Sequence, residues 1–166
     1  MKKISRAVLG AALLAVAGLA SAATTKVFVD SVDNSIVGGV AADALKLSAG
    51  ESFSVIASGF WENDPAGGSY LSGPNGHSDQ TFTTGGYTFD IGTLVGDIDG
   101  TFFKVGSSYS GVAAKTGELE FFYWDSDAAN NSGTVKALVS TVPEPMNVAL
   151  MALALGAFAL TSRRKT

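Results

Sequence analysis

Residues 125–133 (DSDAANNSG) concentrate side chains whose oxygen atoms could bind a metal ion. Asp125, Asp127, Asn130 and Asn131 offer carboxylate and amide oxygens, which are hard donors, and the segment has none of the soft donors that zinc favours. The pattern therefore favours calcium as the ion. The same residue types also fill ordinary turns, and composition alone favours a plain loop between two antiparallel strands over an ion site.

Residues 73–80 (GPNGHSDQ) form a second polar segment, and they contain His77, the only histidine of the chain. A histidine beside Asp79 and several serines suggests a hydrolase, but a catalytic triad needs an oxyanion hole and a strained nucleophile turn, and no serine here has that setting. One histidine without cysteine cannot build the usual zinc site. Outside the candidate ion site, no two carboxylates can be assigned the acid and base roles of a glycosidase. The sequence therefore predicts no catalytic residue.

Short alternating or β-branched runs separated by Gly- and Asp-rich turns predict an all-β domain over residues 23–141. Phe53, Val55 and Ala57 alternate with polar neighbours, as Leu119, Phe121 and Tyr123 do, which predicts one buried face on each strand. The expected fold is a small antiparallel β-sandwich. The candidate strands are residues 26–29, 35–40, 52–60, 87–91, 101–105, 111–115, 118–124 and 134–140. Residues 62–86 are expected to form one long loop, the first place to seek a site.

Charge is unevenly distributed along the sequence. Three of the 11 Lys and Arg residues lie near each end of the chain, whereas all 15 Asp and Glu residues lie between Asp30 and Glu144. The middle therefore carries 5 positive and 15 negative charges, a net charge of about −10. Such a domain repels phosphate backbones, which argues against nucleic acid as a partner, although an acidic surface can also serve solubility alone.

The N-terminus has the pattern of a secretory signal peptide over residues 1–22. Lys2, Lys3 and Arg6 precede an apolar run, and small residues at positions 20–22 predict cleavage by signal peptidase before Ala23.

The C-terminus, residues 142–166, has three consecutive parts. The first is Val142, Pro143, Glu144 and Pro145; the second is an apolar stretch over about residues 146–161; the third is the basic group Arg163, Arg164 and Lys165. The basic end is expected to stay cytoplasmic by the positive-inside rule, which places the domain outside the inner membrane. The short span fits either a transient stop or a permanent anchor.

This order of parts resembles the PEP-CTERM sorting signal that exosortase recognises in Gram-negative bacteria. The resemblance implies processing near the motif and delivery to the cell surface or the exopolysaccharide matrix. An ordinary C-terminal membrane anchor is the alternative.

Several motifs of the domain, taken together in order, resemble the PA-I galactophilic lectin family. They are ASGFW at residues 57–61, GPNGHSDQ at 73–80, GTLVGDI at 92–98, YWD at 123–125 and NNSG at 130–133. The family implies a jelly-roll-like sandwich whose calcium ion binds two sugar hydroxyls directly.

The resemblance also implies roles for particular residues. Asp125, Asn130 and Asn131 match the side-chain ligands of calcium, and Asn63 falls near the residue that gives a backbone carbonyl. Asp127 is either an added ligand or only a loop residue. His77 and Gln80 match the pair that contacts galactose, with Asp125 beside the sugar as well.

The sequence thus predicts an exported, non-catalytic protein that binds galactose-containing glycans or exopolysaccharide through calcium. Self-association into a homo-oligomer would compensate for weak binding of single sugars. The main alternative is a structural matrix protein that has the sandwich without a working sugar site.

Overall fold

The computed structural model describes residues 23–63 and 70–142, which belong to one compact unit, Ala22–Val142. The predicted signal peptide and all but the first residue of the predicted sorting tail lie outside the described residues. Within the described ranges, no helix is long and apolar enough to cross a membrane.

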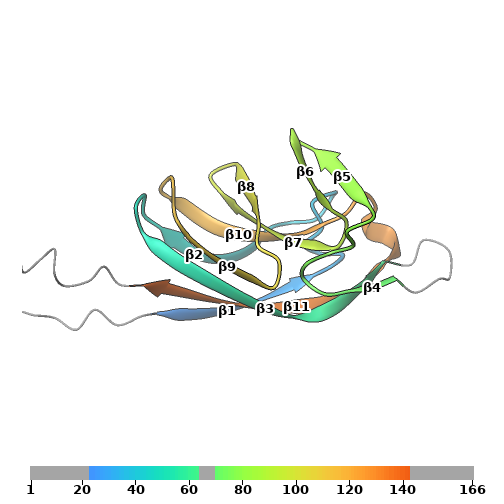
Figure 1. Cartoon of the computed structure of the whole chain (residues 1–166), viewed down its shortest axis with the longest axis horizontal. Helices are drawn as coiled ribbons and strands as arrows, with labels where there is room; N and C mark the ends of the chain where they lie inside the picture. Colours follow the sequence, from blue (N-terminus) through green and yellow to red (C-terminus); the bar gives the residue numbers. More distant parts are fainter. Residues whose placement is uncertain (1–22, 64–69, 143–166) are drawn as a thin grey trace, which may run out of the picture. The chain divides into compact units, whose positions relative to one another are not determined.

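The domain consists of two antiparallel sheets and a separate hairpin (Figure 1). In the first sheet the strand order is β1 (Thr24–Asp30), β11 (Asn131–Val142), β3 (Ser52–Asn63) and β4 (Tyr70–Ser72), and β9 (Ser108–Val112) also pairs with β3. In the second sheet the order is β2 (Ala42–Leu47), β10 (Gly117–Trp124), β7 (Thr93–Ile98) and β8 (Thr101–Lys104). The hairpin is formed by β5 (Thr81–Thr84) and β6 (Tyr87–Asp90). The prediction of an all-β antiparallel fold is confirmed.

The core lies between the two sheets and follows the predicted alternation. Phe53, Val55 and Ala57 of β3 are buried in one cluster with Leu119, Phe121 and Tyr123 of β10. The residues between them on each strand face outward. Because the strand period is two, each sheet has one apolar face, and burying these two faces against each other produces the sandwich.

A second aromatic cluster holds the β5–β6 hairpin against the outer side of the second sheet. Trp124 is 1% exposed, and its indole Nε1 donates to the carbonyl oxygen of Phe82 at 2.9 Å. The rings of Phe89 and Trp124 meet edge to face at 4.9 Å, and Phe102 packs against both Trp124 and Tyr87. This packing fixes the hairpin next to the segment that contains His77.

The predicted strand over residues 35–40 is wrong. This segment forms turns, because Asn34 accepts from the backbone N–H of Asp30 at 2.7 Å and donates to the carbonyl oxygen of Val40 at 2.9 Å. The next strand is instead β2, whose sequence ADALKL is rich in helix-forming residues. Pairing with β10 overrides that local preference.

Three larger differences from the prediction concern other segments. Residues 62–86 are not one loop, since they include the end of β3, the strand β4 and the strand β5. Strand β9 begins and ends three residues earlier than the expected 111–115. Residues 93–98 form β7, a central strand whose six residues are all buried, so it lacks the alternation that identifies a half-exposed strand.

Residues 125–130 do not close a hairpin between paired strands. Strand β10 pairs with β2 and β7, whereas β11 pairs with β1 and β3, so this segment crosses from one sheet to the other at the end of the sandwich. The crossing explains why the segment is more than a simple turn, and it includes one turn of 3-10 helix, η2 (Ala128–Asn130).

Candidate functional site

The candidate site lies where the core reaches the end of the sandwich. Trp61 of β3 and Tyr123 of β10 face each other across the two sheets, with ring centroids 4.6 Å apart. Two residues further along, the next inward positions are Asn63 and Asp125, which are 8% and 3% exposed. The alternation that builds the core therefore ends in an amide and a carboxylate on opposite sheets.

Asn131 lies on the same sheet as Asn63 and directly opposite it in the β3–β11 ladder. Side chains at such directly opposed positions have Cβ atoms about 5 Å apart. The Oδ1 atoms of Asn63, Asn130 and Asn131 are all buried, and none accepts a hydrogen bond within the described part of the chain. Three side-chain carbonyl oxygens at this end of the sandwich, here called the rim, are thus buried without donors among the described residues.

Asp127 has a local structural role in the crossing segment. Its carboxylate accepts from the backbone N–H of Ala129 at 2.9 Å and so caps η2. Its carbonyl oxygen accepts from Nδ2 of Asn131 at 2.9 Å. A carbonyl oxygen can only accept a hydrogen bond, so this second bond must come from the NH₂ group of Asn131 and fixes the orientation of its amide. The Oδ1 atom of Asn131 therefore points away from Asp127.

Asp125 begins the crossing segment immediately after β10. Its Oδ1 accepts from the backbone N–H of Ser126 at 2.6 Å, which orients the carboxylate. Burial raises the pKa of the Tyr123 hydroxyl, and the negative charge of Asp125 raises it further. The structure therefore holds a buried carboxylate two residues beyond Tyr123, at the same end of the sandwich as the three amide oxygens.

His77 and Gln80 are both attached to Ile91, at the junction of β6 and β7. The backbone N–H of His77 donates to the carbonyl oxygen of Ile91 at 2.7 Å. The backbone N–H of Ile91 donates to the carbonyl oxygen of Gln80 at 2.9 Å. The next residue, Gly92, donates its N–H to the carbonyl oxygen of Trp124 at 2.9 Å. These bonds bring the His77 segment to the same end of the sandwich as Asp125.

Tyr70 provides a second connection between the two segments. Its ring meets the ring of His77 edge to face at 5.8 Å, and it lies opposite Asn63 in the β3–β4 ladder. His77 is half-buried, with Nε2 fully buried and without a hydrogen-bond partner among the described residues. Gln80 is exposed. The structure thus gathers all the residues predicted for the site at one end of the domain.

Glycine is required at two positions of this region. Gly76 has φ +75°, and a Cβ there would lie 2.6 Å from the carbonyl oxygen of Ile91. Gly92 has φ +80°, and a Cβ there would lie 2.5 Å from Oγ of Ser72. The carbonyl oxygen of Gly92 also accepts from Nε1 of Trp61 at 2.7 Å. Larger residues would push apart the segments that position His77 and Asp125.

The donor set of this rim fits a hard cation. Leaving a buried acceptor without a hydrogen bond costs about 1–3 kcal/mol, so three such oxygens together are unfavourable unless something binds them. Carboxylate and amide oxygens are ligands that calcium takes readily. Among residues 23–63 and 70–142, no three His, Asp or Glu side chains gather as a metal cluster, so the amides are needed for a metal site at this rim.

Two further polar atoms near this end were missed from the sequence. The hydroxyl of Tyr123 and the Oγ of Ser72 are buried and have no hydrogen-bond partner in the part of the chain that is described. Tyr123 continues the core pattern of β10, and Ser72 lies in a segment predicted as loop. No pattern in the sequence distinguishes either residue from its neighbours.

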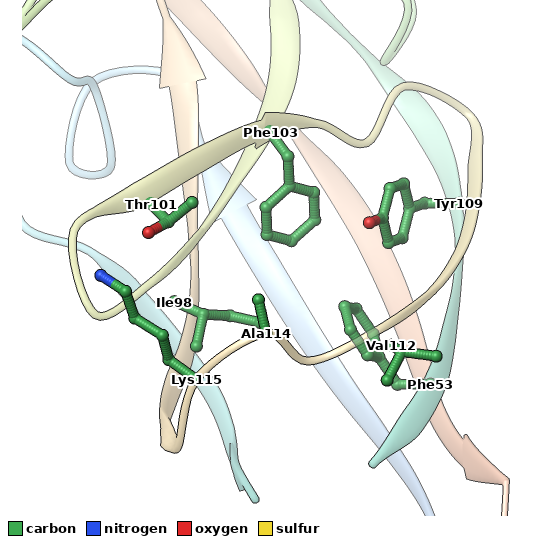
Figure 2. A pocket seen from close by; sticks show the side chains of 8 residues that line it. All are labelled: Phe53, Ile98, Thr101, Phe103, Tyr109, Val112, Ala114 and Lys115. Carbon is green, nitrogen blue, oxygen red and sulfur yellow. The ribbon is translucent and has the colours of Figure 1, made fainter. Parts of the chain in front are cut away.

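A small cavity of about 140 Å³ opens elsewhere in the domain, between the β7–β8 hairpin, β9 and the segment before β10 (Figure 2). Aromatic and aliphatic side chains form most of its lining: Phe53, Ile98, Phe103, Tyr109, Val112 and Ala114, with Thr101 and Lys115. This lining has neither a carboxylate nor an amide side chain, so it does not offer the ligands that calcium needs.

Comparison with solved structures identifies a similar fold. The chain is similar to a structure described as "EclA N-terminal domain; PllA-like lectin", with a TM-score of 0.50 and 24% sequence identity over 72% of this chain and 95% of that one. No protein-family model matches the sequence, and no curated protein matches it either. The likeness shows that this β-sandwich is an architecture also used by a lectin domain.

Proposed function

We propose that this protein is a non-catalytic, calcium-dependent carbohydrate-binding protein of the PA-I galactophilic lectin type. The observation that carries the proposal is that buried, unpartnered oxygens of Asn63, Asn130 and Asn131 occur at the same end of the sandwich as the buried carboxylate of Asp125. A calcium ion at this rim would satisfy these oxygens together, with Asn63 contributing its side-chain oxygen instead of the backbone carbonyl that the family resemblance implies. Its remaining positions would exchange water for sugar hydroxyls.

The fold and the position of the site support binding of a sugar. A fold shared with a lectin domain is compatible with this function. His77 and Gln80 lie at the same end of the domain as the proposed ion, and their side chains can give directional hydrogen bonds to an outer hydroxyl. Such bonds discriminate one sugar epimer from another, which makes galactosides the first class of sugar to test.

A hollow beside η2 gives room for more than one sugar unit. It has a volume of about 670 Å³ and is lined by residues of the turn segment 32–41 together with Ala128 and Ala129. Because η2 leads directly into Asn130 and Asn131, a glycan held at the ion could continue into this hollow. We therefore expect a polysaccharide or an oligosaccharide to be the natural ligand.

The test is a two-step calorimetric titration of residues 23–142, which include the whole core. Calcium is added first, and galactose, a β-galactoside, glucose and mannose follow separately, each with calcium and with EDTA. We expect heat from calcium, and heat from a galactoside only when calcium is present. Absence of both responses would overturn the proposal and favour the structural matrix protein. Release of reducing ends from a glycan panel would indicate an enzyme, and none is expected.

We also propose that the protein is exported and sorted to the cell surface or the extracellular matrix. The sequence supports this through its N-terminal signal pattern and through Val142, Pro143, Glu144 and Pro145 ahead of the apolar stretch and basic end. Mass spectrometry of the protein from the host's surface fraction tests it. Loss of residues 1–22 and a new C-terminus near the motif are expected, whereas an intact tail would indicate a permanent anchor.

A further inference from the structure

The outer face of the first sheet exposes three large apolar side chains. Phe28, Ile56 and Phe60 point away from the core and are 59%, 64% and 63% exposed. Their strands β1 and β3 lie on either side of β11, so the three side chains belong to one surface. Several large apolar side chains exposed on one face of a domain can mark an interaction site.

The ladders arrange this outer face in three rows across β1, β11 and β3. The first row is Lys26, Leu138 and Ile56; the middle row is Phe28, Lys136 and Ser58; the third row is Asp30, Thr134 and Phe60. On β1 a cation and an anion stand symmetrically on either side of Phe28, and on β3 two apolar residues stand symmetrically on either side of Ser58. The pattern is therefore nearly symmetric about the middle row.

We propose that this face binds the same face of a second copy through a two-fold axis that runs along the middle row. Rotation about this axis exchanges the first row with the third row. Lys26 then lies over the partner's Asp30, Ile56 lies over the partner's Phe60, and Phe28 meets its own copy. Both cation–anion pairs and both apolar pairs form at once, as a self-complementary interface requires.

The charges favour this axis over a two-fold axis parallel to the strands. An axis parallel to the strands would exchange β1 with β3, placing Lys26 over the partner's Ile56 and Asp30 over the partner's Phe60. That arrangement would bury two charges of each copy against apolar groups at considerable cost. Neither Lys26 nor Asp30 takes part in an ion pair within the described residues. The ammonium group of Lys26 lies 5.3 Å from the centroid of the Phe28 ring, and Oδ2 of Asp30 accepts from Oγ1 of Thr134 at 3.1 Å, so the pairing with a partner adds to these contacts within one copy.

Lys136 is the one unfavourable residue of the arrangement. It lies in the middle row, so its ammonium group would approach that of the partner's Lys136. Like charges that face each other weaken association. Replacing Lys136 by glutamine should therefore tighten the dimer, whereas reversing the charge of Lys26 should weaken it.

The dimer would carry its two candidate sugar sites at opposite ends. Asn63 and Asn131 lie beyond the third row, and the rotation reverses the direction of the strands. If the proposed sugar binding is correct, one dimer could join two polysaccharide chains, and avidity would compensate for weak single sites. The dimer requires no calcium or sugar. The proposed dimer and the proposed sugar site can therefore be tested, and overturned, independently of each other.

The test is sedimentation velocity of residues 23–142 over a range of concentrations, in EDTA and at low salt. We expect a monomer–dimer equilibrium. Lys26→Glu should weaken the dimer by at least about tenfold, because it sets two pairs of like charges against each other. Adding Asp30→Asn to that variant should restore much of the affinity. Asparagine keeps the side-chain acceptor that Asp30 supplies to the N–H groups of Val32 and Asp33.

The matched control is Lys46→Glu, which makes the same charge change on an exposed position of β2 in the other sheet. It should leave the dimer unchanged, and circular dichroism should show that all variants remain folded. A monomer at every soluble concentration would overturn the proposal. Equal effects of the Lys26 and Lys46 variants, no rescue by Asp30→Asn, or no tightening by Lys136→Gln would also overturn it.

Discussion

Asn63 lies directly opposite Asn131 in the ladder between β3 and β11, and the Oδ1 atoms of both are buried without a hydrogen-bond donor among the described residues. In a strand ladder, opposed inward positions normally carry apolar side chains. Two amides at such a place cost free energy unless a ligand binds them, so this pair is the first place to test for a ligand.

Asp125→Asn should weaken calcium binding by about tenfold or more. The change removes one negative charge and keeps an oxygen that can accept from the N–H of Ser126. Calorimetric titration with calcium measures the difference. Asp127→Asn is the matched control, since asparagine can still cap η2. Equal losses in both variants would show that Asp127 is also a ligand, and no loss in Asp125→Asn would contradict the proposed site.

Asn63→Leu should stabilise the calcium-free protein and abolish its stabilisation by calcium. Leucine has a similar size and removes a buried oxygen without a partner, so we expect a gain of about 1 kcal/mol, or roughly 3–5 °C in Tm. Thermal unfolding in EDTA and in calcium measures both effects. A lower Tm in EDTA would indicate that Asn63 already has an adequate partner. If calcium still stabilises the Asn63→Leu variant, the side chain of Asn63 is not a calcium ligand.

Gln80→Ala should weaken galactoside binding several-fold while leaving calcium affinity and Tm unchanged. The side chain is exposed, and the residue is held in place through its backbone bonds to Ile91 and His77. One lost hydrogen bond to a sugar is worth about 1 kcal/mol, which corresponds to about a fivefold change in Kd. Galactoside titration of the calcium-loaded variant is the measurement. Unchanged sugar affinity would place the sugar elsewhere.

Glu120→Gln should raise Tm at neutral pH, with a gain that disappears in acid. Burial raises the pKa of Glu120, and the nearby Asp43 and Asp97 raise it further. Because of this raised pKa, the folded protein binds a proton at Glu120 more tightly than the unfolded chain does. The contribution of protonated Glu120 to stability is therefore fully present below the pKa of the unfolded chain. It is lost as the pH rises through the folded pKa.

Thermal unfolding of the Glu120→Gln variant and the parent protein from about pH 3.5 to pH 8 tests this sign. The Tm difference should increase with pH across the range above the ordinary glutamate pKa of about 4.3. Glu118→Gln is the matched control, because Glu118 is exposed on the same strand. A difference that decreases with pH would contradict the argument.

The alternation of apolar residues on residues 52–57 and 118–123 was sufficient to predict two half-buried strands and an all-β fold. The oxygen-rich composition of residues 125–133 was sufficient to suggest calcium. These features are local, because side-chain direction in a strand and the chemistry of a ligand set follow directly from residue type and spacing.

Other features depend on pairing between distant segments. Residues 93–98 are buried on both faces and so carry no alternation, and β2 is a strand because β10 pairs with it. The sequence suggested that Asp125, Asn130 and Asn131 lie in one loop between two antiparallel strands, either as calcium ligands or as ordinary turn residues. Only the tertiary structure decided that this loop crosses between sheets and meets Asn63, because strand pairing sets which side chains become neighbours and which oxygens lose access to water.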